Sequence, residues 1–284
     1  MRLSAPTGRL LAAARHACLG ALVLAPLAAP AALACGLDSD CPLGNRSYRI
    51  VAPPGADAAN PVGAIIFAHG YRGDAAGVMS NPGVTTLAAQ LGVALVAAQA
   101  AGPEWNIPNI PSDDALDDVD ELAYFDALAA DIVARFPIDP SRIMVAGFSS
   151  GAMMAWHLAC HRGTAFAGFA PLSGTFWSPL PGTCPAPAGK LIHFHGRDDQ
   201  MVPLHGRPIK DARQGDVIAA LALIAGPDGI HPGPAVREGD LACARLNEAV
   251  GRLLELCLFD GGHAFRPADL ARAARLIGIA RPAN

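Results

Sequence analysis

The pentapeptide at residues 147–151, Gly-Phe-Ser-Ser-Gly, has the G-x-S-x-G pattern and follows a short apolar run at 143–146. Glycine on both sides permits a turn too tight for larger side chains, so Ser149 can be exposed at the end of a strand with its hydroxyl free to attack. A Gly-Ser loop without chemistry is the alternative, because the pattern also arises by chance. A turn signal at 139–142 and helix formers from Ala152 onward favour a nucleophile between a strand and a helix.

A serine nucleophile needs a base to take its proton, and the base needs a carboxylate to orient it. In enzymes with such a turn, the acid and then the histidine follow the serine along the chain. Of the nine histidines, His205, His231 and His263 satisfy that order. His263 is the predicted base, because it lies on a glycine-flanked loop after the last predicted strand. His205 and His231 are interpreted as ordinary loop histidines.

Two adjacent aspartates are candidates for the acid. Asp198 and Asp199 both follow a buried run that ends at His195. Either one would emerge at the carboxyl end of a strand, where the acid is needed. The residue pattern alone does not separate them.

An oxyanion formed by attack on a carbonyl needs two N–H donors. The backbone of Ser150 is the first predicted donor, and Tyr71, in the loop after the strand at 64–68, is the second. His69 in that loop is interpreted as a structural histidine. Three aromatic residues, which could also simply be packed in the core, are predicted to line the substrate cleft: Trp105, Trp177 and Phe265.

Strand and helix patterns alternate along the chain. Apolar runs of strand length, some continuous as in strands buried on both faces, are found at 46–51, 64–68, 93–98, 143–146, 165–172, 190–195 and 252–259. Helical patterns cover 84–90, 117–136, 152–159, 217–225 and 268–277. Acidic residues at 117–121 mark the start of the second helix, where the helix dipole favours negative charge. Repeated β-α units predict a mostly parallel sheet with helices on both faces.

Residues 1–34 have the features of an export signal. Three arginines form a basic start, 17–25 is apolar, and residues 32–34, Ala-Leu-Ala, fit a cleavage site. A retained membrane anchor is the alternative, but prolines and small residues favour cleavage over stable membrane insertion. The remaining residues, 35–284, suit one globular domain. The protein is therefore expected to be secreted or periplasmic.

Six of the seven cysteines lie beyond the predicted signal, and an even number in an exported chain predicts disulfides. Six cysteines allow about fifteen connectivities, and some could be buried thiols. We predict nearest-neighbour pairing: Cys35 with Cys41, Cys160 with Cys184, and Cys243 with Cys257.

Charge and composition argue against several kinds of partner. The net charge of −4 includes the three signal arginines, so it becomes −7 without them. A mildly acidic surface repels phosphate backbones, which argues against nucleic acid. No Cys or His cluster has the spacing of a zinc site.

Six segments, in chain order, resemble a known family: 69–70, 116–119, 139–143, 147–155, 195–203 and 261–263. They are similar to the secreted polyhydroxybutyrate depolymerase and feruloyl esterase-like α/β-hydrolases over nearly all of the predicted mature chain. The resemblance implies a single-domain α/β-hydrolase fold, Asp199 as the acid, His263 as the base, and no metal or organic cofactor. Residues 264–267, Ala-Phe-Arg-Pro, replace the Trp-Pro that the family often carries, which leaves the choice between polymer and feruloyl esters open.

The expected function is that of a secreted serine carboxylic ester hydrolase that forms an acyl-enzyme through Ser149, His263 and Asp199. A serine peptidase of the same fold is one alternative. A binding protein that keeps the fold without catalysis is another.

Overall fold

The computed structural model describes residues 1–2, 35–111, 118–247 and 251–281. Contacts divide the chain into two units, Met1–Leu33 and Ala34–Asn284, and every described strand and helix belongs to the second. The predicted export signal at 1–34 lies almost entirely outside the described residues. Within those residues, no helix combines the length and the apolar character needed to cross a bilayer.

A ten-stranded sheet forms the centre of the fold, in the spatial order β1-β2-β4-β3-β5-β6-β8-β13-β12-β11. Its strands are β1 (Cys41–Leu43), β2 (Arg46–Val51), β3 (Val62–Ala68), β4 (Ala94–Ala98), β5 (Ile138–Phe148), β6 (Gly168–Leu172), β8 (Lys190–Gly196), β11 (Val236–Glu238), β12 (Leu241–Asn247) and β13 (Leu253–Phe259). The six strands from β4 to β13 in this order pair in parallel, and the edges are antiparallel. The predicted mostly parallel sheet is confirmed.

A second sheet has three strands, and they are not hydrogen-bonded to the strands of the first sheet. It consists of β7 (Trp177–Ser178), β10 (Ala212–Gln214) and β9 (Pro208–Ile209), all antiparallel. These strands, together with β1, β11 and β12, were not predicted from the sequence.

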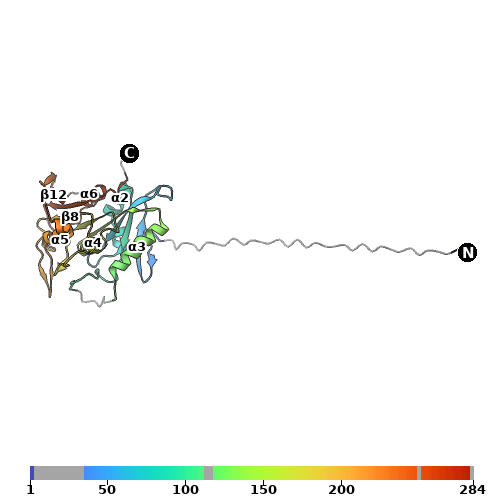
Figure 1. The fold of residues 1–284 in the computed structure, drawn as a ribbon, viewed down its shortest axis with the longest axis horizontal. Helices are drawn as coiled ribbons and strands as arrows, with labels where there is room; N and C mark the ends of the chain where they lie inside the picture. The colour runs from blue at the N-terminus through green and yellow to red at the C-terminus, as the bar shows by residue number, and fades with distance from the viewer. Residues whose placement is uncertain (3–34, 112–117, 248–250, 282–284) are drawn as a thin grey trace. The chain divides into compact units, whose positions relative to one another are not determined.

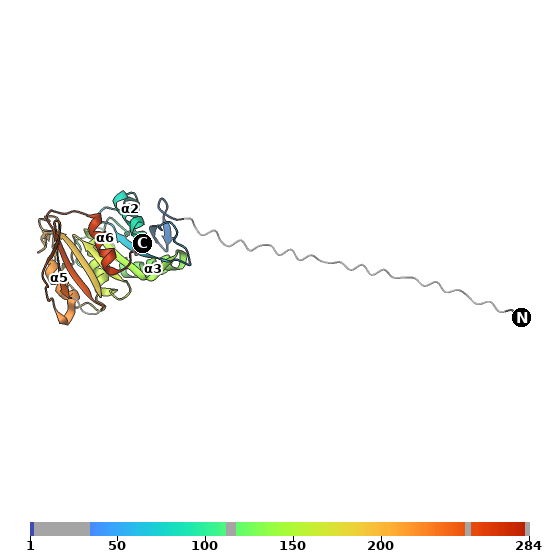
Figure 2. The same cartoon turned by 90° about the horizontal axis from the view of Figure 1, so that it is seen from above.

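Helices cover both faces of the main sheet (Figures 1 and 2). The residues of β3 alternate between two hydrophobic clusters, one containing Ile65 and Phe67, the other Ile66 and Ala68. The first cluster includes α1 (Ala75–Met79), α2 (Pro82–Leu91) and α6 (Pro267–Ile277). The second includes α3 (Glu121–Arg135), α4 (Ser150–His161) and α5 (Val217–Ala225), and a short 3-10 turn (Gly226–Asp228) follows α5.

Helix α3 begins later than its acidic run predicts. The Asp120 carboxylate accepts a hydrogen bond from the Ala123 N–H and caps the helix, so the first helical residue is Glu121. Asp117, the predicted start, lies outside the described residues. Glu121 itself is buried and pairs with Arg46 at 3.0 Å, so this carboxylate ties the helix to β2.

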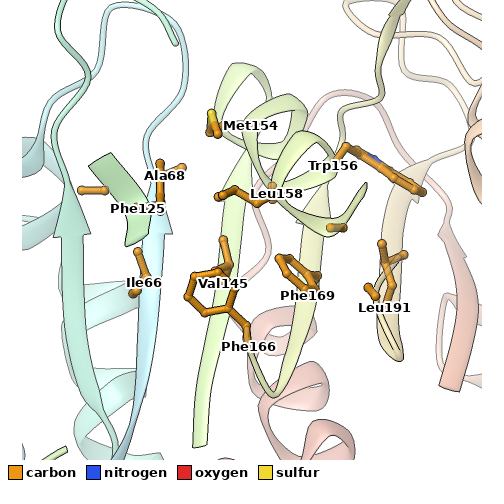
Figure 3. Close-up of a cluster of buried hydrophobic side chains, with 14 of the residues drawn as sticks. Ile66, Ala68, Phe125, Val145, Met154, Trp156, Leu158, Phe166, Phe169 and Leu191 are labelled. Atoms are coloured by element: carbon orange, nitrogen blue, oxygen red, sulfur yellow. The ribbon is translucent and has the colours of Figure 1, made fainter. Parts of the chain in front are cut away.

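Helix α4, which directly follows the candidate nucleophile, is deeply buried. Eleven consecutive residues of α4, from Ser150 to Cys160, are buried. Figure 3 shows its Trp156 and Leu158 side chains directed toward the strand residues of the sheet. A helix anchored so firmly fixes the position of its own first residue, Ser150.

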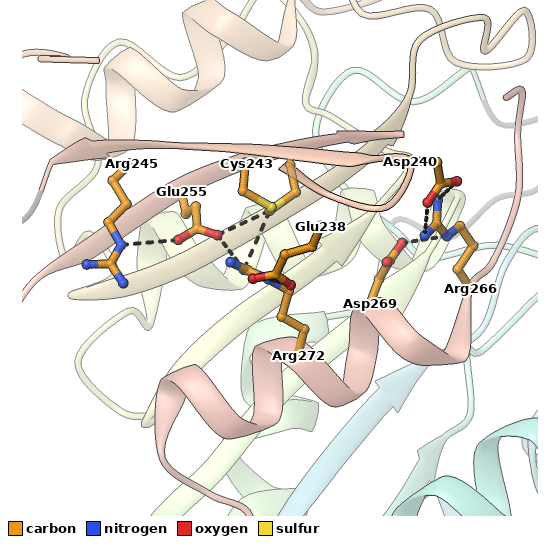
Figure 4. Close-up of a disulfide and its surroundings, with 9 residues drawn as sticks. Glu238, Asp240, Cys243, Arg245, Glu255, Arg266, Asp269 and Arg272 are labelled. Atoms are coloured by element: carbon orange, nitrogen blue, oxygen red, sulfur yellow. Dashed lines mark hydrogen bonds and ion pairs between the residues drawn. A yellow bond between two sulfur atoms is a disulfide. The ribbon is translucent and has the colours of Figure 1, made fainter. Parts of the chain in front are cut away.

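All three predicted disulfides are present: Cys35–Cys41, Cys160–Cys184 and Cys243–Cys257. The last one joins directly opposite residues of β12 and β13. Figure 4 shows how ion pairs attach α6 to this edge of the sheet: Arg272 contacts Glu255, and Arg266 Nη1 lies 2.8 Å from Asp240 Oδ2. The C-terminal end of the loop between β13 and α6, at Arg266, is therefore tied to Asp240 beside β12.

Truncation of one α4 side chain should measure how much this packing contributes. Leu158→Ala removes a fully buried side chain, and we expect the free energy of unfolding to fall by about 2–5 kcal/mol because a cavity forms. Urea denaturation of both proteins measures the change. Leu37→Ala makes the same substitution at an exposed site and should cost far less. Equal losses for the two variants would contradict the role assigned to α4.

Candidate active site

Ser149 occupies a strained turn between β5 and α4. Its backbone has φ +57° and ψ −120°, a conformation that non-glycine residues rarely adopt. The Ser149 N–H donates to the Leu172 carbonyl of β6 at 3.0 Å, which secures the turn to the neighbouring strand.

The two glycines of the pattern are required by close packing. A Cβ at Gly147 would overlap the Gly151 carbonyl, and a Cβ at Gly151 would overlap the Ala68 carbonyl at the end of β3. Strand, turn and helix therefore approach each other more closely than any side chain permits. The sequence-based prediction of a tight turn at Ser149 is confirmed in its backbone geometry.

Asp199 and His263 are brought together from loops far apart in the chain. Oδ2 of Asp199 lies 2.7 Å from Nδ1 of His263. Oδ1 of Asp199 accepts hydrogen bonds from the N–H groups of Met201 and Val202, each at 2.9 Å. Asp199 is only 2 % exposed, whereas Asp198 is exposed. The geometry thus separates two residues that the sequence pattern did not.

The charge on Asp199 is stabilised despite its burial. Burial acts to raise the pKa of this carboxyl, but the hydrogen bonds from His263 and the Val202 N–H outweigh it, so the pKa lies below its ordinary value. The carboxylate is therefore ionised at neutral pH. It accepts the Nδ1–H of His263, which leaves Nε2 of that ring as the site for a second proton.

Two buried histidines of β8 support the Asp199 loop. Nε2 of His195 donates to the Val202 carbonyl at 2.7 Å, so its Nδ1 accepts a hydrogen bond from Nε2 of His193 at 2.9 Å. Burial lowers the pKa of both rings, and both are neutral at pH 7. In the sequence these histidines are visible only as part of an apolar strand, although their i, i+2 spacing places them on one face.

Backbone hydrogen bonds join the loops that carry Asp199 and His263. The Asp198 N–H donates to the Gly261 carbonyl at 2.9 Å, and the Arg197 N–H donates to Phe259. The His263 ring packs on Phe148, the residue before Ser149, with a centroid distance of 4.7 Å. The imidazole is thereby held beside the turn that carries the serine.

The two predicted oxyanion donors also lie beside Ser149. Ser150 is the first residue of α4, where the backbone N–H has no acceptor within the helix. The Gly73 N–H closes a turn onto the Gly70 carbonyl, which leaves the N–H of Tyr71 unused by that turn. A Cβ at Gly70 would lie 3.7 Å from the Ser149 Cβ, so this loop borders the nucleophile.

His69 shapes that loop as a neutral residue. Its Nε2 accepts from the Ala100 N–H at 3.1 Å, so Nδ1 carries the proton and donates to the Gly70 carbonyl at 2.9 Å. Burial lowers the pKa of the ring. These contacts agree with the structural role predicted for His69.

A cavity of about 280 Å³ adjoins the serine. Its walls include Tyr71, Ser149, Ser150, Trp177 and Gln214. Among the described residues, three buried polar atoms of this wall have no hydrogen-bond partner: Ser150 Oγ, Trp177 Nε1 and Gln214 Oε1. Gln214 was not singled out from the sequence, because a polar residue in a short irregular segment carries no signal of burial.

The three aromatic residues predicted to line the cleft occupy different environments. Trp177 lines the cavity. Trp105 does not: it is fully buried, its Nε1 donates to the His69 carbonyl, and its ring packs against Phe125. Phe265 does not line it either, because its ring packs against Phe148 and the sheet. Trp105 therefore contacts the loop that carries His69 and not the cavity.

One cluster in the described part of the chain has the spacing of a metal site, namely Cys243, Glu255 and Cys257. Both sulfurs are joined in a disulfide, and Glu255 pairs with Arg272. These residues therefore stabilise the β12–β13 edge of the sheet.

Comparison with solved structures identifies the architecture. The acetyl xylan esterase from Aspergillus awamori superposes with a TM-score of 0.61 over 83% of this chain and 95% of that one, at 15% identity. An S-formylglutathione hydrolase from Agrobacterium tumefaciens gives 0.53 over 82% and 90%, also at 15% identity. The chain has the α/β-hydrolase fold.

Sequence comparisons relate this α/β-hydrolase to esterases. The Phospholipase/Carboxylesterase family profile matches residues 119–211. NocK of Nocardia uniformis subsp. tsuyamanensis, named as a candidate esterase, is 29% identical over 57% of this chain and 47% of its own length. A protein of Aspergillus niger named as a candidate feruloyl esterase C is 25% identical over 58% of each chain. The chain thus spans about half the length of these relatives, and its resemblance to esterases of this fold is confirmed.

The α/β-hydrolase offers a matched pair of substitutions at its adjacent aspartates. Asp199→Asn should lower kcat for a p-nitrophenyl ester by about 10³–10⁴-fold, because His263 would lose the carboxylate that fixes its tautomer. Asp198→Asn removes an exposed charge one position away and should stay within about threefold of the wild type. Steady-state kinetics with both variants distinguishes the two positions. A larger loss from Asp198→Asn would reverse the assignment.

Proposed function

We propose that this α/β-hydrolase is a serine carboxylic ester hydrolase that works through an acyl-enzyme. The observation that carries the proposal is the strained turn at Ser149, bordered by the hydrogen-bonded pair of Asp199 and His263. Strain of this kind costs about 1–3 kcal/mol and is retained mainly where function requires it. The similarity to candidate esterases supports the same reaction class.

In the proposed mechanism, Ser149 Oγ attacks the ester carbonyl while Nε2 of His263 takes its proton. The ionised Asp199 stabilises the imidazolium that forms. The N–H groups of Ser150 and Tyr71 bind the developing oxyanion. His263 then protonates the departing alcohol, and a water molecule, activated by the same ring, hydrolyses the acyl-enzyme to release the acid and regenerate Ser149.

We propose an ester of the kind taken by polyhydroxybutyrate depolymerases or feruloyl esterases, with Trp177 in the binding wall. We also propose that residues 1–34 direct export and are removed, because three disulfides suit an oxidising compartment.

Replacement of the nucleophile tests the reaction class. Ser149→Ala should reduce hydrolysis of short p-nitrophenyl esters to background, because no other hydroxyl takes the place of Oγ. Circular dichroism and thermal melting should match the wild type. Labelling by a fluorophosphonate probe should occur in the wild type and be absent from the variant, since only an activated serine reacts. Residual turnover or labelling in Ser149→Ala would refute the assignment.

The export proposal has its own test. Expression with the full leader in a Gram-negative host should give a mature protein outside the inner membrane that begins at residue 35. N-terminal sequencing of the periplasmic and culture fractions measures the cleavage point. Recovery of the uncleaved chain from the membrane fraction would contradict it.

A further inference from the structure

The cavity beside Ser149 is lined by two residues whose buried side-chain polar atoms the ester mechanism does not use. Trp177 Nε1 and Gln214 Oε1 both belong to residues that line the cavity and are more than nine-tenths buried, at 7 % and 3 % exposure. Neither atom has a hydrogen-bond partner among the described residues, so they do not bond to each other. Buried polar groups are normally paired, so the unpaired atoms of these two neighbouring residues require an explanation.

The two residues are placed together by the small sheet. Gln214 of β10 lies directly opposite Trp177 of β7 in an antiparallel register. Opposite residues in such a ladder project on the same side, with Cβ atoms about 4.5–5.5 Å apart. The ladder is anchored on both sides, since the Gln214 N–H donates to Arg207 and the Gly215 N–H donates to Phe176. The wall is therefore built into the fold.

The chemistry of the two atoms is complementary. The indole N–H of Trp177 can only donate, and the amide Oε1 of Gln214 can only accept. A single hydroxyl group can satisfy both, because it accepts one hydrogen bond and donates another. An alkyl chain in the same position would satisfy neither and would leave both polar groups buried.

We propose that Trp177 and Gln214 form a subsite that recognises a hydroxyl group on the ester substrate. This inference rests on the proposed esterase function and adds the substrate class to it. The hydroxyl can belong to the acid part, as in a hydroxyacyl ester, or to the alcohol part, as in a polyol ester. Both sources present the same donor and acceptor to the wall.

Matched esters in which a methyl group replaces the hydroxyl test the subsite. The acid arm compares p-nitrophenyl 3-hydroxybutanoate with p-nitrophenyl 3-methylbutanoate, and the alcohol arm compares 2-hydroxyethyl butanoate with propyl butanoate. In one arm, the wild type should prefer the hydroxylated ester by about tenfold or more in kcat/KM, the effect of two hydrogen bonds. The arm that shows the preference identifies whether the hydroxyl belongs to the acid or to the alcohol part. If neither arm shows a preference, the proposal is overturned.

Variants connect the preference to the two residues. Gln214→Met keeps the length of the side chain but offers only a weak sulfur acceptor, and Trp177→Phe keeps an aromatic ring but cannot donate. Each should reduce the ratio between the matched esters to about threefold or less. Gln90→Met, on the exposed side of α2, makes the same chemical change away from the cavity and should leave the ratio unchanged. Retention of the full ratio in both cavity variants refutes the subsite.

A binding measurement avoids dependence on the folding of those variants. In Ser149→Ala, the indole N–H resonance of Trp177 should shift when the hydroxylated ester of the preferred pair is added, and not with its methyl counterpart. Equal shifts with both esters would overturn the proposal. Failure of the esterase proposal gives a different result, namely no fluorophosphonate labelling of the wild type and no hydrolysis of any of the four esters.

Discussion

The backbone at Ser149 is the constraint on which the rest of the site depends. Its positive φ is unfavourable for serine, and the surrounding contacts leave the chain no alternative. The strand before it is clamped between β3 and β6, and the helix after it is buried along almost its whole length. Interactions spread over the core therefore offset a local strain of about 1–3 kcal/mol. The same rigidity fixes the position of Ser150, the first residue of α4.

The Asp199 carboxylate is charged, whereas the two histidines of β8 next to it are neutral. The carboxylate keeps its charge because it receives several hydrogen bonds, whereas the two histidines beneath it lose theirs through burial. His193 bonds to His195, and His195 bonds to the carbonyl of Val202, the residue whose N–H donates to Asp199. A positive charge on either of these rings would compete with His263 for the carboxylate. As neutral rings, His193 and His195 position the loop of Asp199 without competing for its charge.

Much of the main sheet could be predicted from the sequence, because its central strands are continuous apolar runs with turn residues between them. The bounds of β2 and α5 agree with the prediction, and the loop of His263 follows its strand as expected. The short edge strands could not be predicted, since two or three residues show no periodicity. The difference between Asp198 and Asp199 depends on the peptides that face each of them, which only the folded chain brings into position. The same is true of Trp105 and Trp177, because an isolated aromatic residue has the same appearance in a core as in a cavity wall.

The small sheet lies outside the hydrogen-bonded ladder that supports Ser149, Asp199 and His263. The segment that contains β7 is tied to the end of α4 by the Cys160–Cys184 bond, so its attachment does not depend on those three residues. Mutational drift in β7 and β10 could therefore change which molecules the protein accepts while the reacting groups stay in register. Such independence would let related proteins that share one ancestor differ in substrate while they keep the same reacting residues.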